Sequence, residues 1–119
     1  MLEQRPWGFF NVLGDSKRFK VKTLMVKPHS RLSLQSHEHR HEHWFVVEGI
    51  ADVEVGTTKA RLFVGQSINV AIGEKHRISN TTDNWLYIVE VQTGESFDES
   101  DITRYQDDYD RVADNMRKV

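Results

Sequence analysis

The sequence between Gln35 and His43 reads Gln-Ser-His-Glu-His-Arg-His-Glu-His, so a histidine stands at every second position from His37 on. Successive side chains of an extended strand point to opposite faces, and Gln35, His37 and His39 therefore share one face. Grouped neutral imidazoles are ready ligands for Zn, Fe, Mn, Ni or Cu. The segment predicts a divalent metal site. The alternative is a solvent-exposed histidine tract that binds metal weakly.

The elements that position these residues are predicted to be β-strands. Short runs rich in β-branched and aromatic residues recur between Gly, Asn, Asp and Pro residues, which is typical of an antiparallel sandwich or barrel. Apolar and polar residues alternate along residues 19–26 and 51–55, so each run has one buried and one wet face. Gly49 and the segment Gly56-Thr57-Thr58 predict hairpin turns. The expected strands are residues 9–13, 19–26, 31–35, 43–48, 51–55, 60–63, 67–71, 76–79 and 85–91.

The end of the chain has a different pattern. From Asp107 on, Tyr109, Val112, Ala113 and Met116 recur at helical spacing, with acidic residues before them and basic residues after them. This pattern predicts one short C-terminal helix. Because there is no repeat, low-complexity tract or linker, we expect a single domain over residues 1–119.

Composition excludes several classes of protein. Sixteen basic and eighteen acidic residues give a net charge of -2, so no positive field favours a nucleic-acid partner. No apolar run reaches membrane-spanning length, and the first residues lack the apolar run of a secretory signal. The absence of cysteine restricts any metal to nitrogen and oxygen ligands. We expect a cytoplasmic protein that binds neither nucleic acid nor a membrane.

Two segments together resemble the two sequence motifs of the cupin family. The first contains His37, His39, Glu42 and Gly49, and the second contains Gly65, Ala71, Gly73, His76 and Asn80. Ala71 replaces the usual proline, and the interval from His39 to Glu42 is shorter than in the general pattern. The resemblance implies an all-β, RmlC-like jelly-roll barrel with a metal bound by His37, His39, Glu42 and His76. Either Glu42 or His43 takes the acidic position, and Glu42 is favoured because it has the inward parity of Trp44.

A closer resemblance is to the type II mannose-6-phosphate isomerase domain, which also forms the C-terminal part of bifunctional mannose-1-phosphate guanylyltransferases. It covers almost the whole chain and implies a metal-dependent interconversion of mannose 6-phosphate and fructose 6-phosphate, in the supply of polysaccharide precursors. The Gly-rich nucleotide-binding segment of the guanylyltransferase part is absent. The matching segments include Arg5-Pro6-Trp7-Gly8, Lys20-Val21-Lys22, Leu32-Ser33-Leu34-Gln35, Glu42-His43-Trp44, Glu90-Val91-Gln92-Thr93-Gly94 and Asp101-Ile102-Thr103-Arg104.

The resemblance also implies roles for particular residues. The metal would be Zn, Mn, Ni, Co or Fe, with Gln35 as an added candidate ligand beside the cupin set. A carboxylate, amine or imidazole near it would carry the proton, and a basic group would bind the phosphate. Candidates for proton transfer are Glu38, His41, Lys22 and Glu90. Candidates for substrate binding are Lys20, Arg40, Trp44 and Arg77.

Two functions other than isomerisation would use the same metal-binding residues. One is a non-catalytic module that binds a metal and a sugar phosphate, and the other is a different metal-cupin enzyme such as an oxygenase. The isomerase resemblance makes an oxygenase the weaker alternative. Phe45 and Val47 have outward parity, and a second subunit covering them would make a homodimer.

Overall fold

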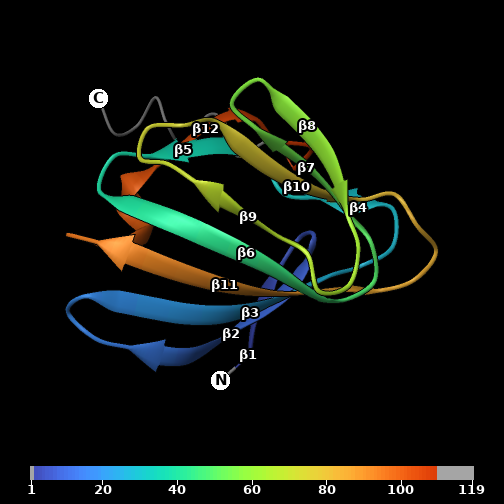
Figure 1. The fold of residues 1–119 in the computed structure, drawn as a ribbon, viewed down its shortest axis with the longest axis horizontal. Coiled ribbons are helices and arrows are strands. Elements are labelled where there is room, and N and C mark those ends of the chain that lie inside the picture. Colours follow the sequence, from blue (N-terminus) through green and yellow to red (C-terminus); the bar gives the residue numbers. More distant parts are fainter. Residues whose placement is uncertain (1, 110–119) are drawn as a thin grey trace.

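The computed structural model describes residues 2–109, which form two facing β-sheets (Figure 1). The first sheet has the strand order β1-β2-β3-β11-β6-β9, and the second has the order β12-β5-β10-β7-β8, with β4 paired to β10. All strand pairs are antiparallel, as expected from the alternating sequence pattern. The strands of the first sheet are β1 (Leu2–Arg5), β2 (Gly8–Asp15), β3 (Phe19–Val26), β6 (Arg40–Glu48), β9 (Ser67–Val70) and β11 (Leu86–Gly94). Those of the second are β4 (Ser30–Arg31), β5 (Leu34–His37), β7 (Ala51–Val55), β8 (Thr58–Leu62), β10 (His76–Asn80) and β12 (Ile102–Gln106).

The expected all-β barrel is confirmed, and the bounds predicted for β3 and β7 are those observed. The strand predicted over residues 31–35 is divided into β4 and β5. β1 and β12 were not predicted, because both are exposed along most of their length and lack an apolar alternation. A three-residue 3-10 helix, η1 (Glu99–Asp101), precedes β12. The predicted C-terminal helix lies outside the described residues.

The turns after β6 and β7 differ in kind. β7 and β8 pair directly through the turn after Val55, so the hairpin predicted there is confirmed. The hairpin predicted at Gly49 is wrong, because β6 pairs with β9 and β11 while β7 pairs with β8 and β10. Gly49, with a φ of 90°, instead carries the chain from one sheet to the other.

The inward-facing positions of the central strands change character along the barrel. In β11, Leu86 and Ile88 are fully buried, and the next inward residues are Glu90 and Gln92. In β10, Ile78 is buried in the same core and His76 is the inward residue at the strand's start. The space between the sheets is therefore an apolar core at one end and a buried polar site at the other.

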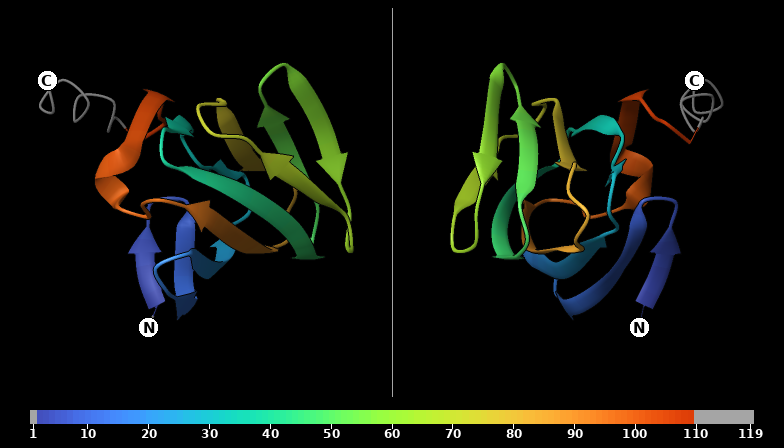
Figure 2. Two further views of the ribbon diagram at one scale, coloured as in Figure 1. Left: turned by 60° about the vertical axis from the view of Figure 1, so that its left-hand side comes forward. Right: turned by 90° about the vertical axis from the view of Figure 1, so that its right-hand side faces the viewer.

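The polar end is bordered by segments that are far apart in sequence. Figure 2 shows that the β1–β2 hairpin and the segment from Gly94 to Gln106 lie on the same side of the molecule. This arrangement brings Arg5 of β1 and Glu99 of η1 to the same pocket. None of the helices in the part of the chain that the structure describes is long and apolar enough to cross a membrane.

Candidate metal centre

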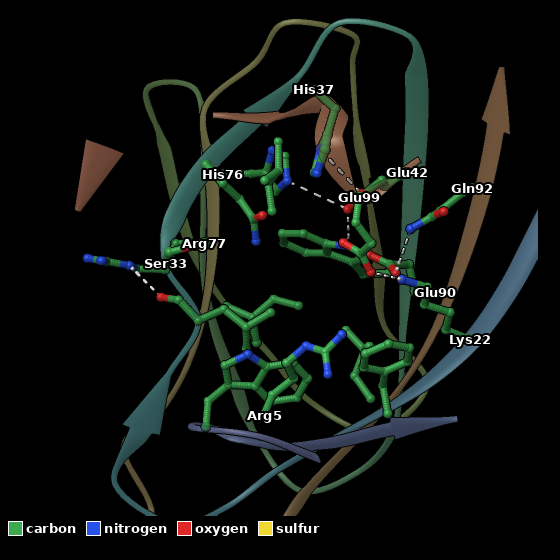
Figure 3. Close-up of a pocket in the computed structure, with 18 of the residues that line it drawn as sticks. Arg5, Lys22, Ser33, His37, Glu42, His76, Arg77, Glu90, Gln92 and Glu99 are labelled. Atoms are coloured by element: carbon green, nitrogen blue, oxygen red, sulfur yellow. Dashed lines mark hydrogen bonds and ion pairs between the residues drawn. The ribbon is translucent and has the colours of Figure 1, made fainter. Parts of the chain in front are cut away.

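Three buried side chains converge at the polar end of the barrel (Figure 3). His37 comes from β5, Glu42 from β6 and His76 from β10, and their ligand atoms all lie within 4.8 Å of one another. Nδ1 of His37 is 3.4 Å from Oε2 of Glu42, and Nε2 of His76 is 3.6 Å from Oε1. The cluster therefore spans both sheets, with the two imidazoles on one and the carboxylate on the other.

Strand register explains why the two histidines meet. His37 is the last residue of β5 and His76 is the first of β10. These strands are antiparallel neighbours, and Gln35 pairs with His76. Because the end of one strand lies beside the start of the other, their rings are 5.0 Å apart, centre to centre.

A backbone contact orients the His76 ring. Nδ1 of His76 is 2.8 Å from the carbonyl oxygen of Glu74. A carbonyl only accepts hydrogen bonds, so Nδ1 carries the proton and Nε2 presents its lone pair to Glu42. Such a partner on the second ring nitrogen is the usual support of a metal-binding histidine.

Burial keeps both imidazoles neutral. Removal from water lowers the pKa of His37 to about 2, with the positive charge of Arg40 and the neighbouring His76 acting in the same direction. Burial likewise lowers the pKa of His76 and outweighs its hydrogen bond to the Glu74 carbonyl. Neutral histidines retain the lone pair that a metal requires.

The unsatisfied atoms of this cluster fit a divalent metal. Both ring nitrogens of His37 and Nε2 of His76 are buried without a hydrogen-bond partner. Oε1 of Gln35 is also buried and unpartnered, and it stands beside His76 in the strand register. Buried polar atoms normally have partners, and here two neutral imidazoles converge on one carboxylate. A cation bound by His37, Glu42 and His76, with Gln35 nearby, would satisfy them.

A second carboxyl group lies next to this cluster. Nε1 of Trp44 donates to Oε1 of Glu42 at 3.1 Å and to Oε1 of Glu90 at 3.2 Å. Nε2 of Gln92 donates to the other oxygen of Glu90 at 3.1 Å. Burial, and then the negative charge of Glu42, raise the pKa of Glu90 to about 8. A buried carboxyl with this pKa is suited to hold and release a proton near neutral pH.

These groups line a single pocket, and most of the predicted site residues lie in it. The members of the predicted set that line it are Lys22, Gln35, His37, Arg40, Glu42, Trp44, His76, Arg77 and Glu90. Arg77 contributes to the wall, but its Nε donates to the Leu32 carbonyl and its terminal nitrogens donate to Gln106. The guanidinium of Arg77 therefore joins β10 to neighbouring segments, and its predicted role in substrate binding stays a prediction.

The structure does not bring His39 and Glu38 to the pocket, and the expected shared face of His37 and His39 is a correction. β5 ends at His37, so strand alternation stops there. Both following residues are exposed, and their backbone amides donate to the carboxylate of Asp101 at 3.1 Å and 3.0 Å. The turn between β5 and β6 points their side chains away from the metal cluster.

Three further predicted residues lie outside the pocket. β6 resumes with Arg40, Glu42 and Trp44 inward, so His41 and His43 face outward, and His43 contacts Asn69. Glu42 rather than His43 therefore occupies the acidic position of the cluster. Lys20 has the parity of Lys22 but lies near the start of β3, where its neighbours in the strand register are Asp15 and Gln92. It does not line the pocket.

Gln92 and Glu99 are polar residues of the pocket wall that were not found from the sequence. Gln92 follows Glu90 by two positions on β11, so its inward parity was a usable signal. Glu99 forms an ion pair with Lys22 at 3.4 Å from the loop before β12. No local pattern identifies it, because its partner is far away in the sequence.

The two-sheet barrel with a His-Glu-His cluster at one end defines the cupin, or double-stranded β-helix, class of protein. An RmlC-like cupin from Shewanella frigidimarina superposes with a TM-score of 0.73 at 15% identity, over 84% of this chain and 87% of the other. Oxalate decarboxylase from Lactobacillus farciminis has a TM-score of 0.75 at 17% identity, over 87% of this chain and 33% of the enzyme. At these identities the likeness establishes the fold alone.

Sequence comparison gives the family. The model described as "Mannose-6-phosphate isomerase C-terminal" matches residues 2–107, and the chain belongs to this family. The alginate biosynthesis protein AlgA of Pseudomonas aeruginosa is 44% identical over 115 residues, which are 97% of this chain and 24% of AlgA. The xanthan biosynthesis protein XanB of Xanthomonas campestris is 43% identical over 108 residues, 91% of this chain and 23% of XanB. The chain thus spans about a quarter of the length of these curated relatives.

Proposed function

We propose that this domain is a metal-dependent isomerase that interconverts mannose 6-phosphate and fructose 6-phosphate. The observation that carries the proposal is the buried His37–Glu42–His76 cluster, whose unpartnered ring nitrogens face a pocket that also contains Glu90. Family membership supports the substrate class, because the matching family is described by this isomerase.

The reaction moves a proton between C2 and C1 of the sugar while the carbonyl changes place, and negative charge develops on the substrate oxygen. A bound divalent metal would supply Lewis acidity toward that oxygen. Glu90 is our choice for the proton-transfer group, because Glu38 and His41 lie outside the pocket and the ammonium group of Lys22 is paired with Glu99. As base it takes the proton from C2, and as acid it returns the same proton to C1, while the proton of the C2 hydroxyl passes to the oxygen on C1, so that a carbonyl is left at C2. The donors Trp44 and Gln92 hold its two oxygens in place.

The test is a coupled assay for fructose 6-phosphate with protein stripped by a chelator and reloaded with single divalent ions. We expect turnover with at least one ion and none in its absence. A matched His41→Ala variant, which changes an exposed histidine outside the pocket, should behave as wild type. Absence of turnover with every ion would refute the isomerase.

A non-catalytic binding module is the second candidate. This candidate is favoured because the match covers only a small part of the length of the relatives. For the mannose-1-phosphate guanylyltransferase ManC of Salmonella typhimurium, it covers 22% of the length. In such a protein the barrel would bind the metal and a sugar phosphate in support of another activity. Calorimetric binding of mannose 6-phosphate without turnover would favour this candidate over the isomerase.

A further inference from the structure

A lysine is buried in the wall of the pocket, on β3, where it pairs with Glu90 of β11 in the strand register. The side chain of Lys22 is 7% exposed, and its ammonium group lies 4.4 Å from the centre of the Phe10 ring. Its hydrogen-bond partner among the described residues is Oε1 of Glu99, at 3.4 Å. A buried ammonium group has three donors and requires a negative partner, so one long contact leaves it poorly satisfied.

A second cation shares the same aromatic ring. The guanidinium carbon of Arg5 lies 4.7 Å from the centre of Phe10, and Arg5 also lines the pocket. Figure 3 shows Arg5 and Lys22 pointing into the pocket. An aromatic ring offers each cation only a weak attraction, so two cations beside the Phe10 ring make this part of the pocket positive.

Glu99 supplies the negative charge in this region. Burial opposes its ionisation, but the charges of Lys22, Arg40 and more weakly Arg5 outweigh burial and lower the pKa of Glu99. Its side chain is nevertheless 53% exposed and comes from the three-residue η1. A carboxylate held by one long hydrogen bond and by nearby charges, on a side chain that is half exposed to solvent, is readily displaced by a stronger anion.

We infer that Lys22 and Arg5, with the charge of Arg40, form a subsite for the phosphate group of the substrate, and that Glu99 occupies its position when no substrate is bound. A phosphate monoester carries up to two charges and three strong acceptor oxygens, so it offers Lys22 more than one carboxylate oxygen does. The identity of the ligand as a sugar phosphate rests on the proposed function, whereas the anion subsite itself rests on these contacts.

The experiment measures binding of inorganic phosphate to the full, metal-free chain by NMR titration in a phosphate-free buffer. Glu99→Gln should bind phosphate more tightly than wild type, by about threefold or more, because a competing carboxylate is gone. Glu95→Gln is the matched control, since it makes the same charge change at an exposed residue outside the pocket, and it should leave affinity unchanged. Lys22→Met should weaken binding by about tenfold or more.

A gain of affinity in Glu99→Gln cannot arise from a misfolded protein, so this variant decides the question even where Lys22→Met is unstable. Equal or weaker phosphate binding by Glu99→Gln would overturn the inference, as would an equal gain in Glu95→Gln. The proposed function fails separately. Phosphate binding as predicted, without turnover of mannose 6-phosphate, would refute the isomerase and support the phosphate subsite. Turnover of mannose 6-phosphate without these changes in phosphate affinity would support the isomerase and refute the subsite.

Discussion

Nε2 of His76 faces the carboxylate of Glu42 across the gap between the two sheets, at 3.6 Å. With Nδ1 of His76 directed at the Glu74 carbonyl, Nε2 presents a lone pair to a negative oxygen. Two acceptors at this distance repel each other unless a cation lies between them. The cluster of His37, Glu42 and His76 is thus arranged for a positive ion. Loss of one of these ligands, or of the ion, should have effects that can be measured.

Replacement of His76 by Ala is expected to lower divalent metal affinity by at least about 100-fold, because it removes a ligand and not merely its support. The barrel should remain folded, since its apolar core between the sheets does not involve His76, and unfolding free energy should fall by about 1–3 kcal/mol. Metal content and calorimetric titration test the first expectation, and thermal unfolding followed by circular dichroism tests the second.

The control for this variant is His41→Ala, on the outward face of β6. It should retain both metal affinity and stability. An unfolded His76→Ala protein would contradict the expectation and make the metal part of the folding free energy. Unchanged metal affinity would remove His76 from the site.

The metal-free protein should lose stability as the pH falls below about 6.5, the ordinary pKa of histidine. His37 and His76 have lowered pKa values in the folded state, so the unfolded chain binds more protons below that pH. As the pH falls, each of these histidines should lower the free energy of unfolding by about 1.4 kcal/mol per pH unit until the pKa of its folded state is reached. The measurement is urea unfolding of chelator-treated protein between pH 7 and about pH 5.

The variant His37→Gln isolates this contribution, because it should reduce the slope of unfolding free energy against pH by one histidine's share. Comparison with wild type cancels the effect of Glu90, whose raised pKa acts in the opposite direction by losing stability as the pH rises toward about 8. An identical slope in both proteins would show that His37 titrates normally in the folded state.

Glu90→Gln tests the proton-transfer role separately from the metal. The amide has nearly the shape of the carboxyl group but cannot carry the proton, so turnover should fall by about 100-fold or more. Metal affinity should change little, since Glu90 is outside the cluster of three ligands. A Glu48→Gln variant, at an exposed position of β6, is the charge-matched control. Wild-type turnover in Glu90→Gln would exclude this carboxyl as the proton carrier.

Strand alternation explains how much of the site could be predicted. Gln35 with His37, and Glu42 with Trp44, lie on uninterrupted strands, so counting by two places them correctly. The same counting fails for His39, because the turn after His37 resets the parity. Lys22 and Glu99 illustrate a different limit, since their contact joins distant segments and depends on where η1 packs. The local sequence pattern therefore predicts which face of a strand a side chain lies on. Which side chains from distant segments contact each other, as Lys22 and Glu99 do, depends on tertiary packing.

Gly94 packs closely against the backbone of the turn between His37 and Glu42. A Cβ atom at Gly94 would overlap the carbonyl oxygen of His39 and lie 2.8 Å from Cα of Arg40. Gly94→Ala is therefore expected to shift this turn, weaken metal binding and lower the unfolding free energy by about 1–3 kcal/mol. Gly65→Ala is the control, because Gly65 also has a positive φ, 86°, which is strained for alanine, while an added Cβ meets no atom within 4 Å. Equal effects of both variants on metal affinity would show that the contact with the turn is unimportant.

The outward face of the first sheet is largely apolar where β3, β11 and β6 lie side by side. Phe45 and Val47 are 41% and 42% exposed, and Val89 pairs with both Phe45 and Thr23. The outward residues of these strands that are at least partly exposed include Val21, Phe45, Val47, Tyr87, Val89 and Val91, with His41 and His43 toward the start of β6. None of these residues is a lysine, arginine, aspartate or glutamate, so a two-fold axis can place the face against itself without repulsion between such side chains.

We therefore predict that a second copy of the chain covers this face. Sedimentation at micromolar concentration should give a species of twice 13.9 kDa, and Phe45→Lys should shift it toward the monomer because it buries two charges across the axis. Phe63→Lys is the matched control, since Phe63 is equally apolar, 50% exposed and outside the first sheet. A wild-type monomer would contradict the dimer. Equal dissociation by both variants would place the interface elsewhere, because a lysine at Phe63 lies away from the face formed by β3, β11 and β6.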